Sequence, residues 1–166
     1  EAFAREAKDR NIKISFDVNY RGKLWTMDEA SKVMPKLVEM ADIVFAGPVD
    51  CIKILGCTDT IGEDTGRAME DKKVGEQVLK ELAEKYGIRY VINSQRESIS
   101  ATHNMIGARI LNGKTGEFVY SKCYDVDSIV DRVGGGDALA AGVLSALSYD
   151  YEDYAGAIEF GAAASA

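Results

Sequence analysis

The chain is poor in several residue types, and each scarcity narrows the class of protein. Its 166 residues include two prolines, three cysteines, one histidine and one tryptophan. Lys and Arg number 20 against 27 Asp and Glu, a net charge of −7, which argues against a nucleic-acid partner because binding phosphate backbones needs basic surface. The low proline content and the 46% share of hydrophobic residues both argue against a disordered chain. There is no apolar run of bilayer-spanning length and no signal-peptide pattern at the start, so no membrane partner is expected.

The cysteines and the ends of the chain carry two further expectations. Cys51, Cys57 and Cys123 lack metal-ligand spacing, so we expect free thiols in a reducing cytoplasm. The chain opens at Glu1 without a methionine, and both ends have helix-like patterns. We therefore expect a piece of a longer protein, with residues 1–166 forming one partial domain.

Helical and strand patterns alternate along the chain, which is typical of a three-layer α/β domain with a mostly parallel sheet. Thr26 and Glu29 have capping-box spacing, and Pro35 should kink or divide the helix that follows. The expected strands cover 12–17, 42–46 and 90–92, with a hairpin or meander over 106–121. The expected helices cover 1–10, 26–41, a short stretch from 47, 74–86, 137–148 and a last segment from 151, with a turn over 62–66.

In such sheets ligands bind beyond the carboxyl ends of the strands. This rule selects Asp17–Arg21, the Gly47–Asp50 turn and Asn93–Glu97, and the glycine loop before Asp137 is a fourth place.

The glycine loop, Gly134 to Gly136, is the most informative stretch. Three glycines let backbone N–H groups approach a ligand, and the following helix start adds unpaired N–H groups and a positive dipole end, which suits phosphate. Asp137 in the first turn could accept a proton from a substrate hydroxyl. The alternative from composition alone is a flexible turn with Asp137 as an ordinary helix-start residue. The spacing fits neither the Walker phosphate loop nor the dinucleotide motif.

The segment Asp131-Arg-Val-Gly-Gly-Gly-Asp137 resembles the C-terminal signature of the ribokinase-like (PfkB) sugar kinases. Two further stretches, Asp17-Val-Asn-Tyr-Arg-Gly-Lys-Leu-Trp25 and Ser94-Gln-Arg-Glu-Ser-Ile-Ser-Ala-Thr-His-Asn104, resemble the 2-keto-3-deoxygluconate kinase branch. The three motifs occur in the right order over essentially the whole chain. The resemblance implies Asp137 as catalytic base and Gly134, Gly135 and Gly136 as an anion hole over the transferred phosphoryl group.

Asp17, Asn19 and Arg21 follow a strand at alternate positions and would project to one side. The planar fork of Arg21 suits a carboxylate or a phosphate, so we expect a substrate or phosphate contact. By the resemblance, Asn19 contacts a nucleotide phosphate or a metal-bound water. The alternative is a surface ion pair between Asp17 and Arg21. Trp25 is expected to pack rather than bind.

Many ribokinase-like enzymes carry N-x-x-E after a strand, where this chain has Gly47-Pro-Val-Asp50. Asp50 could still reach Mg²⁺ through water, or could simply begin a helix. Asn93, Ser94 and Arg96 are candidate nucleotide contacts by position, the alternative being a polar loop at a strand end. A lone histidine in a polar run is more often structural, so His103 is not a candidate.

The resemblance implies ATP-dependent phosphorylation of a sugar hydroxyl, most closely of 2-keto-3-deoxygluconate to its 6-phosphate, with ATP and Mg²⁺ in the cytoplasm. The alternatives are a kinase for fructose or ribose, and a non-catalytic module that binds nucleotide or sugar acid. The family's N-terminal part and β-sheet lid, which often pairs into homodimers, have no counterpart in these residues. We therefore expect little kinase activity from the 166 residues alone.

Overall fold

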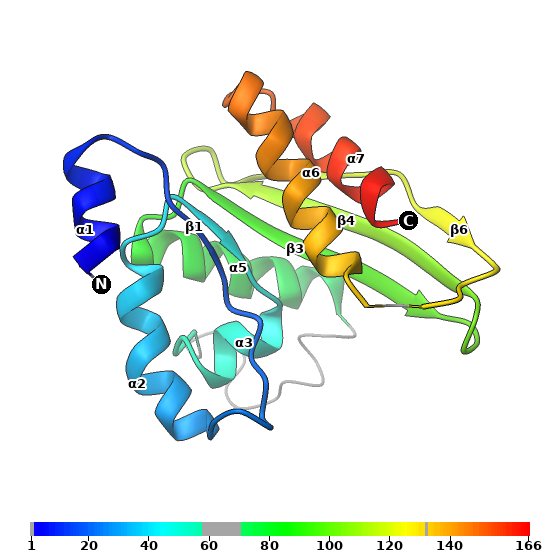
Figure 1. Cartoon of the computed structure of the whole chain (residues 1–166), viewed down its shortest axis with the longest axis horizontal. Helices are drawn as coiled ribbons and strands as arrows, with labels where there is room; N and C mark the ends of the chain where they lie inside the picture. The colour runs from blue at the N-terminus through cyan, green and yellow to red at the C-terminus, as the bar shows by residue number, and fades with distance from the viewer. Residues whose placement is uncertain (1, 58–70, 132) are drawn as a thin grey trace. The chain divides into compact units, whose positions relative to one another are not determined.

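The protein is described by a computed structural model covering residues 2–57, 71–131 and 133–166 (Figure 1). The expected turn over 62–66 lies outside these residues. No helix among them is long and apolar enough to cross a membrane. In chain order the elements are α1 (Ala2–Asp9), β1 (Ser15–Asp17), α2 (Met27–Val38), β2 (Ile43–Phe45), α3 (Pro48–Lys53), α5 (Lys72–Tyr86), β3 (Tyr90–Ser98), β4 (Asn104–Asn112), β5 (Glu117–Tyr120), β6 (Tyr124–Val126), α6 (Gly135–Tyr149) and α7 (Tyr154–Ser165).

The six strands form a mixed sheet in the order β1-β2-β3-β4-β5, with β6 beside β4. β1 and β2 are parallel, whereas β4 pairs antiparallel with both β5 and β6. The predicted α/β class is confirmed. The chain divides into two compact units, Glu1–Val91 with Gly113–Gly116, and Ile92–Asn112 with Glu117–Ala166. Each unit is described by itself below.

In the first unit the predicted capping box begins α2. The Thr26 hydroxyl accepts from the N–H of Glu29, and the Glu29 carboxylate accepts from the N–H of Thr26. Pro35 does not divide this helix, because it lies in the last turn and removes only the one hydrogen bond that its own nitrogen would have made.

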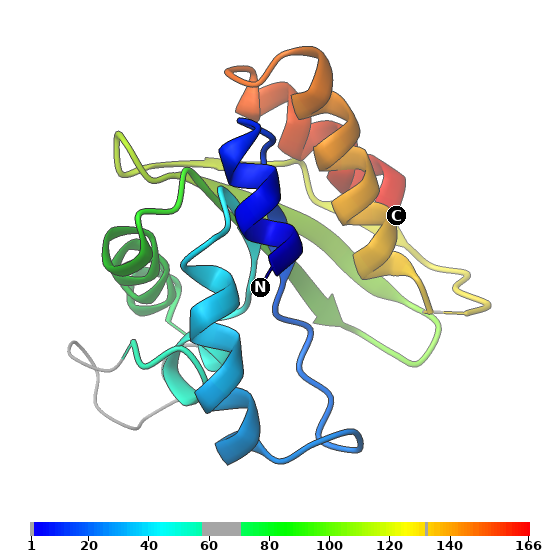
Figure 2. The same cartoon turned by 60° about the vertical axis from the view of Figure 1, so that its left-hand side comes forward.

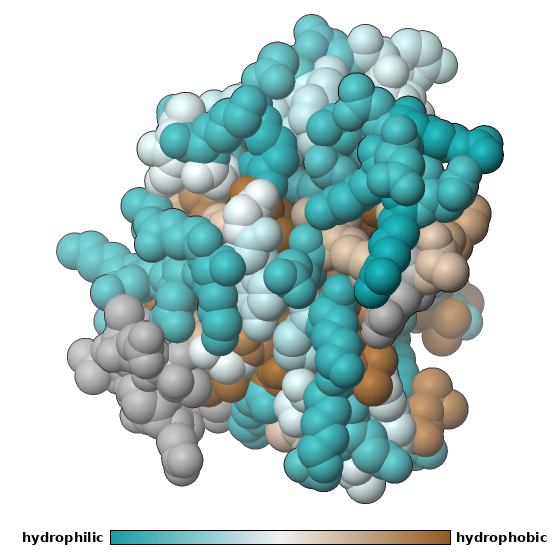
Figure 3. All heavy atoms as spheres, turned by 90° about the vertical axis from the view of Figure 1, so that its left-hand side faces the viewer, coloured by the Kyte–Doolittle hydropathy of each residue, from teal (hydrophilic) through white to brown (hydrophobic). Residues whose placement is uncertain are grey.

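Figure 2 shows α1 and α2 from the side. The face in Figure 3 is mostly hydrophilic, with smaller apolar areas between the polar side chains and at its edge.

The elements in the middle of the first unit agree closely with those predicted from the sequence. All three residues of β2 are buried, and Pro48 occupies the first turn of α3 after Gly47. Helix α5 ends at Gly87 in the left-handed conformation, with φ of 67°. Gly113 is required by close approach, since a Cβ there would lie 2.0 Å from the carbonyl oxygen of Ile88.

The second unit consists of β3 from Ile92 onward, β4, β5 and β6, with a helical hairpin of α6 and α7, which lie side by side (Figures 1 and 2). The two helices approach closely at Gly142 and Gly161, where a Cβ on Gly142 would lie 2.7 Å from the Gly161 Cα. The absence of a side chain at Gly142 therefore lets the two helices pack tightly. The expected 106–121 hairpin is formed by β4 and β5, and β6 was not predicted.

Candidate active site

The glycine loop forms the start of α6 in the second unit. Gly134 is the N-cap residue in the left-handed conformation, with φ of 89°, and its carbonyl accepts the first helical hydrogen bond from Ala138. The N–H groups of Gly135, Gly136 and Asp137 have no partner within the helix, as at every helix start. A Cβ on Gly134 or Gly136 would meet nothing within 4 Å among the described residues, so the space over the turn is open. This turn fits a phosphate group.

Asp137 is the third residue of α6, and its side chain is exposed. At this position the positive end of the helix stabilises a carboxylate. Asp137 lies next to the open glycine turn in the chain, so one helix start presents both the anion-binding groups and a proton acceptor. The role of general base stays a proposal.

Arg21 lies in the exposed segment between β1 and α2, two residues after Asn19, whose φ of 33° is unusual for a residue with a Cβ. Asparagine is among the few residue types that tolerate this region. Such outliers occur at functional sites, although they do not prove function. Trp25 is partly buried and its backbone carbonyl accepts a hydrogen bond from Tyr20, while the packing role of its side chain stays a prediction.

The positive charge of Arg21 lies near enough to influence the carboxyl of Asp50. Burial raises the pKa of the Asp50 carboxyl, while a hydrogen bond from the backbone of Gly47 and the charge of Arg21 oppose this rise. Asp50 is the third residue of α3 and reaches back to the N-cap, so it does begin a helix as one interpretation expected. The nearby charge of Arg21 is also compatible with the other interpretation, in which Asp50 belongs to the binding site.

Residues 93–97 form part of β3, so the expected strand over 90–92 is too short and the alternative of a polar loop at its end is wrong. The strand continues because its polar residues pair within the sheet. Asn93 is partly buried, whereas Ser94 and Arg96 are exposed. Since side chains alternate along a strand, Asn93 points to one face and Ser94 and Arg96 to the other.

The register of β4 shows which face this is. Asn112 and Ile106 of β4 have Glu117 of β5 and Tyr124 of β6 as their register partners. Both partners contact α7: the Tyr154 hydroxyl donates to Glu117 at 3.1 Å, and the Tyr124 hydroxyl donates to Glu159 at 2.7 Å. Even-numbered β4 residues therefore face α7, and odd-numbered ones face away.

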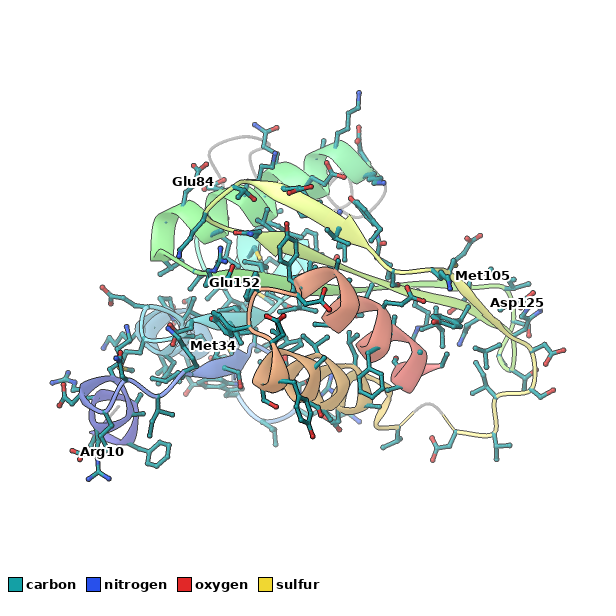
Figure 4. The ribbon with its side chains drawn as sticks, turned by 90° about the horizontal axis from the view of Figure 1, so that it is seen from above. Arg10, Met34, Glu84, Met105, Asp125 and Glu152 are labelled. Carbon is teal, nitrogen blue, oxygen red and sulfur yellow. The ribbon has the colours of Figure 1, made fainter. Side chains whose placement is uncertain are left out.

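Arg109, an odd-numbered residue, donates from Nε to the Oδ1 of Asn93 at 3.0 Å. Asn93 thus points away from α7. By the alternation along β3, Ser94 and Arg96 point to the opposite face, toward α7. Figures 1 and 4 show α6 and α7 together on that side of β3 and β4. Ser94 and Arg96 thus lie on the face that α7 covers and Asn93 on the other, and the role of all three as nucleotide contacts stays a prediction.

Sequence reasoning missed Arg109, which is only 4% exposed and lies over the ring of Phe118. An arginine inside the apolar run of β4 is the signal that could have found it, because arginine is rarely buried without a partner. His103 contacts Asp125 at 2.5 Å, an arrangement typical of a structural histidine. Figure 4 shows Asp125 and its register partner Met105 at the end of the sheet.

The predicted residues fall in both units. Asn19, Arg21 and Asp50 belong to the first unit, and the β3 residues and the glycine turn belong to the second. A groove of about 330 Å³ in the first unit, lined by residues such as Phe3, Arg10 and Ile12, contains none of them.

The glycine turn is the part of the described residues whose shape suits a phosphate such as those of ATP. The open glycine turn matches a phosphate, and no group of three His, Cys, Asp or Glu side chains in residues 2–57, 71–131 and 133–166 could hold a metal ion. Mg²⁺ that is bound to a nucleotide keeps several waters and needs few protein ligands.

No protein-family model matches the chain. The solved structure of 2-dehydro-3-deoxygluconokinase from Thermotoga maritima is similar to it, with 33% identity and a TM-score of 0.83 over 98% of this chain and 46% of that protein. A PfkB family carbohydrate kinase from Listeria grayi is 31% identical, with a TM-score of 0.82 over 99% of this chain and 46% of that protein.

An Escherichia coli protein assigned as ribokinase II, solved with ATP and Mg²⁺, shares the fold at 18% identity, with a TM-score of 0.66 over 96% of this chain and 43% of that protein. The chain thus spans about half the length of the proteins it matches. Together with the three ordered motifs, these similarities identify the chain as a member of the ribokinase-like (PfkB) carbohydrate kinase family.

Proposed function

We propose that the protein carrying this chain transfers the γ-phosphoryl group of ATP to a hydroxyl of 2-keto-3-deoxygluconate, giving the 6-phosphate. The observation that carries the proposal is the start of α6, which presents the N–H groups of Gly135 and Gly136 beside the exposed carboxylate of Asp137. Phosphoryl transfer depends chiefly on positioning and on stabilising negative charge, and this turn offers both.

In the proposed reaction the sugar hydroxyl oxygen attacks the γ-phosphorus. The new oxygen–phosphorus bond forms while the bond to the bridging β–γ oxygen breaks, and ADP leaves with that oxygen. The hydroxyl proton passes to the carboxylate of Asp137, and the backbone N–H groups of the glycine turn stabilise charge on the transferred group. Mg²⁺, when bound, neutralises phosphate charge, with Asp50 as a candidate contact through water. Ser94 and Arg96 contact the nucleotide, and Asn19 a phosphate or a metal-bound water.

The proposed substrate class rests on Arg21 and on the Thermotoga relative. A 2-keto sugar acid carries a carboxylate, which the guanidinium of Arg21 can bind through two parallel hydrogen bonds. Arg21 is exposed, so it is available to a ligand. Neutral sugars such as fructose and ribose offer no such anionic group.

The test is a substrate comparison with the intact protein that carries this chain. ADP release is measured with 2-keto-3-deoxygluconate, fructose and ribose, and we expect the highest kcat/KM for the sugar acid. A preference for fructose or ribose would assign a different sugar kinase. Binding of ATP without turnover on any of the three would instead support a non-catalytic binding module. That second candidate is favoured by Asp50, whose carboxylate is engaged by the backbone of Gly47 in place of the family's N-x-x-E.

A further inference from the structure

Tyr20 lies next to Arg21 in the segment between β1 and α2. Its hydroxyl donates a hydrogen bond to the carbonyl oxygen of Trp25 at 3.2 Å, and the side chain is partly buried. The phenolic edge lies over Gly22, where a Cβ would come within 3.4 Å of the hydroxyl oxygen. The tyrosine therefore bridges the two ends of the segment 20–25.

Both ends of this segment are fixed by other contacts. Before it, the N–H of Val18 donates to the carbonyl of Phe45 at 3.0 Å, which continues the pairing of β1 with β2. After it, Thr26 begins α2 through the capping box. Only the stretch between these anchors is free to change shape without disturbing the sheet or the helix.

Within that stretch the contacts are few. The N–H of Leu24 donates to the carbonyl of Arg21 at 2.9 Å and closes one turn. The side chain of Leu24 is 82% exposed, and Gly22 and Lys23 are exposed as well, so apolar packing holds the turn in place only weakly. The hydroxyl of Tyr20 is thus the one side-chain contact described that spans the turn from which Arg21 projects.

We propose that Tyr20 is a positioning residue, whose bond to the Trp25 carbonyl holds the segment in the conformation that presents Arg21 to an anionic ligand. The inference rests on the role of Arg21 in the proposed function. An arginine on a loose turn must lose conformational freedom when it binds, whereas a turn closed beforehand has lost part of it already. The ligand chemistry is a pair of anionic oxygens, supplied either by the carboxylate of the sugar acid or by a phosphate of ATP.

The decisive variant is Tyr20→Phe in the intact protein, because it removes the hydroxyl and keeps the ring over Gly22. Tyr149→Phe is the matched control, since Tyr149 is 92% exposed at the end of α6. A single hydrogen bond of this kind predicts a roughly two- to tenfold rise in KM for the substrate that Arg21 holds, with a smaller change in kcat. A rise for the sugar acid assigns the carboxylate, and a rise for ATP assigns a phosphate. Without measurable turnover, dissociation constants from calorimetry replace KM.

Two further measurements separate positioning from general stability. Hydrogen–deuterium exchange of the peptide covering 21–26 should quicken in Tyr20→Phe and not in Tyr149→Phe. In an Arg21→Gln background, Tyr20→Phe should cause no additional loss, because its effect passes through Arg21.

The outcomes also separate this inference from the proposed function. An impaired Arg21→Gln with an unaffected Tyr20→Phe would overturn the role of Tyr20 and leave that of Arg21. Equal losses from Tyr20→Phe in both backgrounds would show a structural role and overturn positioning. An Arg21→Gln variant with unchanged kinetics would overturn the role of Arg21 in the proposed function, and the inference with it.

Discussion

Asp137 is exposed in the first turn of α6, where a carboxylate can stabilise a helix or accept a proton. Replacing Asp137 by Asn keeps the shape and removes the proton acceptor. If it is the general base, kcat of the intact protein should fall by roughly 10²- to 10⁴-fold while ATP binding is largely retained. Steady-state kinetics and calorimetric titration with ATP measure the two effects.

Asp28→Asn is the control for that substitution, because Asp28 is also an exposed carboxylate in the first turn of a helix. It should leave kcat unchanged and alter only stability, since it also loses an ion pair with Lys32. An Asp137→Asn enzyme with the parent kcat would remove Asp137 from the base role.

Asp50 gives a prediction in pH, because burial raises its pKa above the usual value of 3.8. A carboxyl with a raised pKa in the folded state favours folding when protonated. Its contribution is complete below pH 3.8 and is lost as the pH rises through the folded-state pKa. Asp50→Asn should therefore gain stability relative to the parent between pH 4 and pH 7, as the parent pays for an ionised buried group.

Urea unfolding at several pH values measures this difference. A parent and variant that keep a constant gap in unfolding free energy over this range would contradict the raised pKa. If Asp50 also serves the site, Asp50→Asn should lower kcat/KM despite its stability, as substitutions at functional positions often do.

The residues differ in how far the sequence could predict them. The start of a helix at the glycines was predicted by residue type and spacing and is confirmed, because the signal is local, while the role of Asp137 stays a prediction. The contacts of Arg109 with Asn93 and of Tyr20 with Trp25 were not, because hydrogen bonds over five or more residues depend on how the backbone turns.

At the level of elements, the α6–α7 hairpin depends on the absence of a side chain at Gly161. A Cβ there would lie 2.5 Å from Cγ2 of Val143 and 2.9 Å from the carbonyl oxygen of Leu139. Alanine would by itself favour the helix by about 1 kcal/mol. We expect the clash to outweigh this, so that Gly161→Ala lowers the free energy of unfolding by about 1–3 kcal/mol.

Denaturant unfolding followed by circular dichroism checks this prediction, with Ala163→Gly as the matched control. Ala163 is exposed in the same helix, so its replacement reports helix propensity without a packing change. A Gly161→Ala variant as stable as the parent would show that the two helices can separate slightly at little cost.

The elements that the sequence predicted best are those with local signals. The Thr26 capping box is confirmed, and so are a helix start near residue 47 and a helix end at residue 86, where Pro48 and Gly87 act within a few residues. The extension of β3 through Ser98 and the existence of β6 were missed. Both depend on pairing with distant strands, which allows polar residues to continue a strand that local propensity would end.

For the molecule as a whole, the acidic charge of −7 has a consequence for binding ATP and a sugar acid. Both ligands are anions, so the overall charge opposes them and attraction must be local. Among the described residues, such attraction is available at the start of α6, at Arg21 and at Arg96.

Fold class and family were predictable because the three motifs occur in order over the whole chain. The division into two units was not, since contact density between segments is not encoded in any single motif.

The length leads to the last prediction, because the chain spans about half of its relatives. Phosphoryl transfer to a sugar rather than to water requires that the site exclude solvent. The start of α6 and Arg21 are exposed in these 166 residues, so water has access to the proposed reaction centre. We therefore expect the 166-residue chain alone to turn over far below the roughly 1–100 s⁻¹ of ordinary kinases.

A coupled assay of ADP release, with and without 2-keto-3-deoxygluconate, measures this turnover. The same chain carrying Asp137→Asn sets the background from contaminating kinases. ADP release in the ordinary range that disappears in Asp137→Asn would show that these residues suffice for catalysis. Slow ADP release that is independent of the sugar acid and sensitive to Asp137→Asn would instead show that the chain binds ATP and activates water, as expected of an open site.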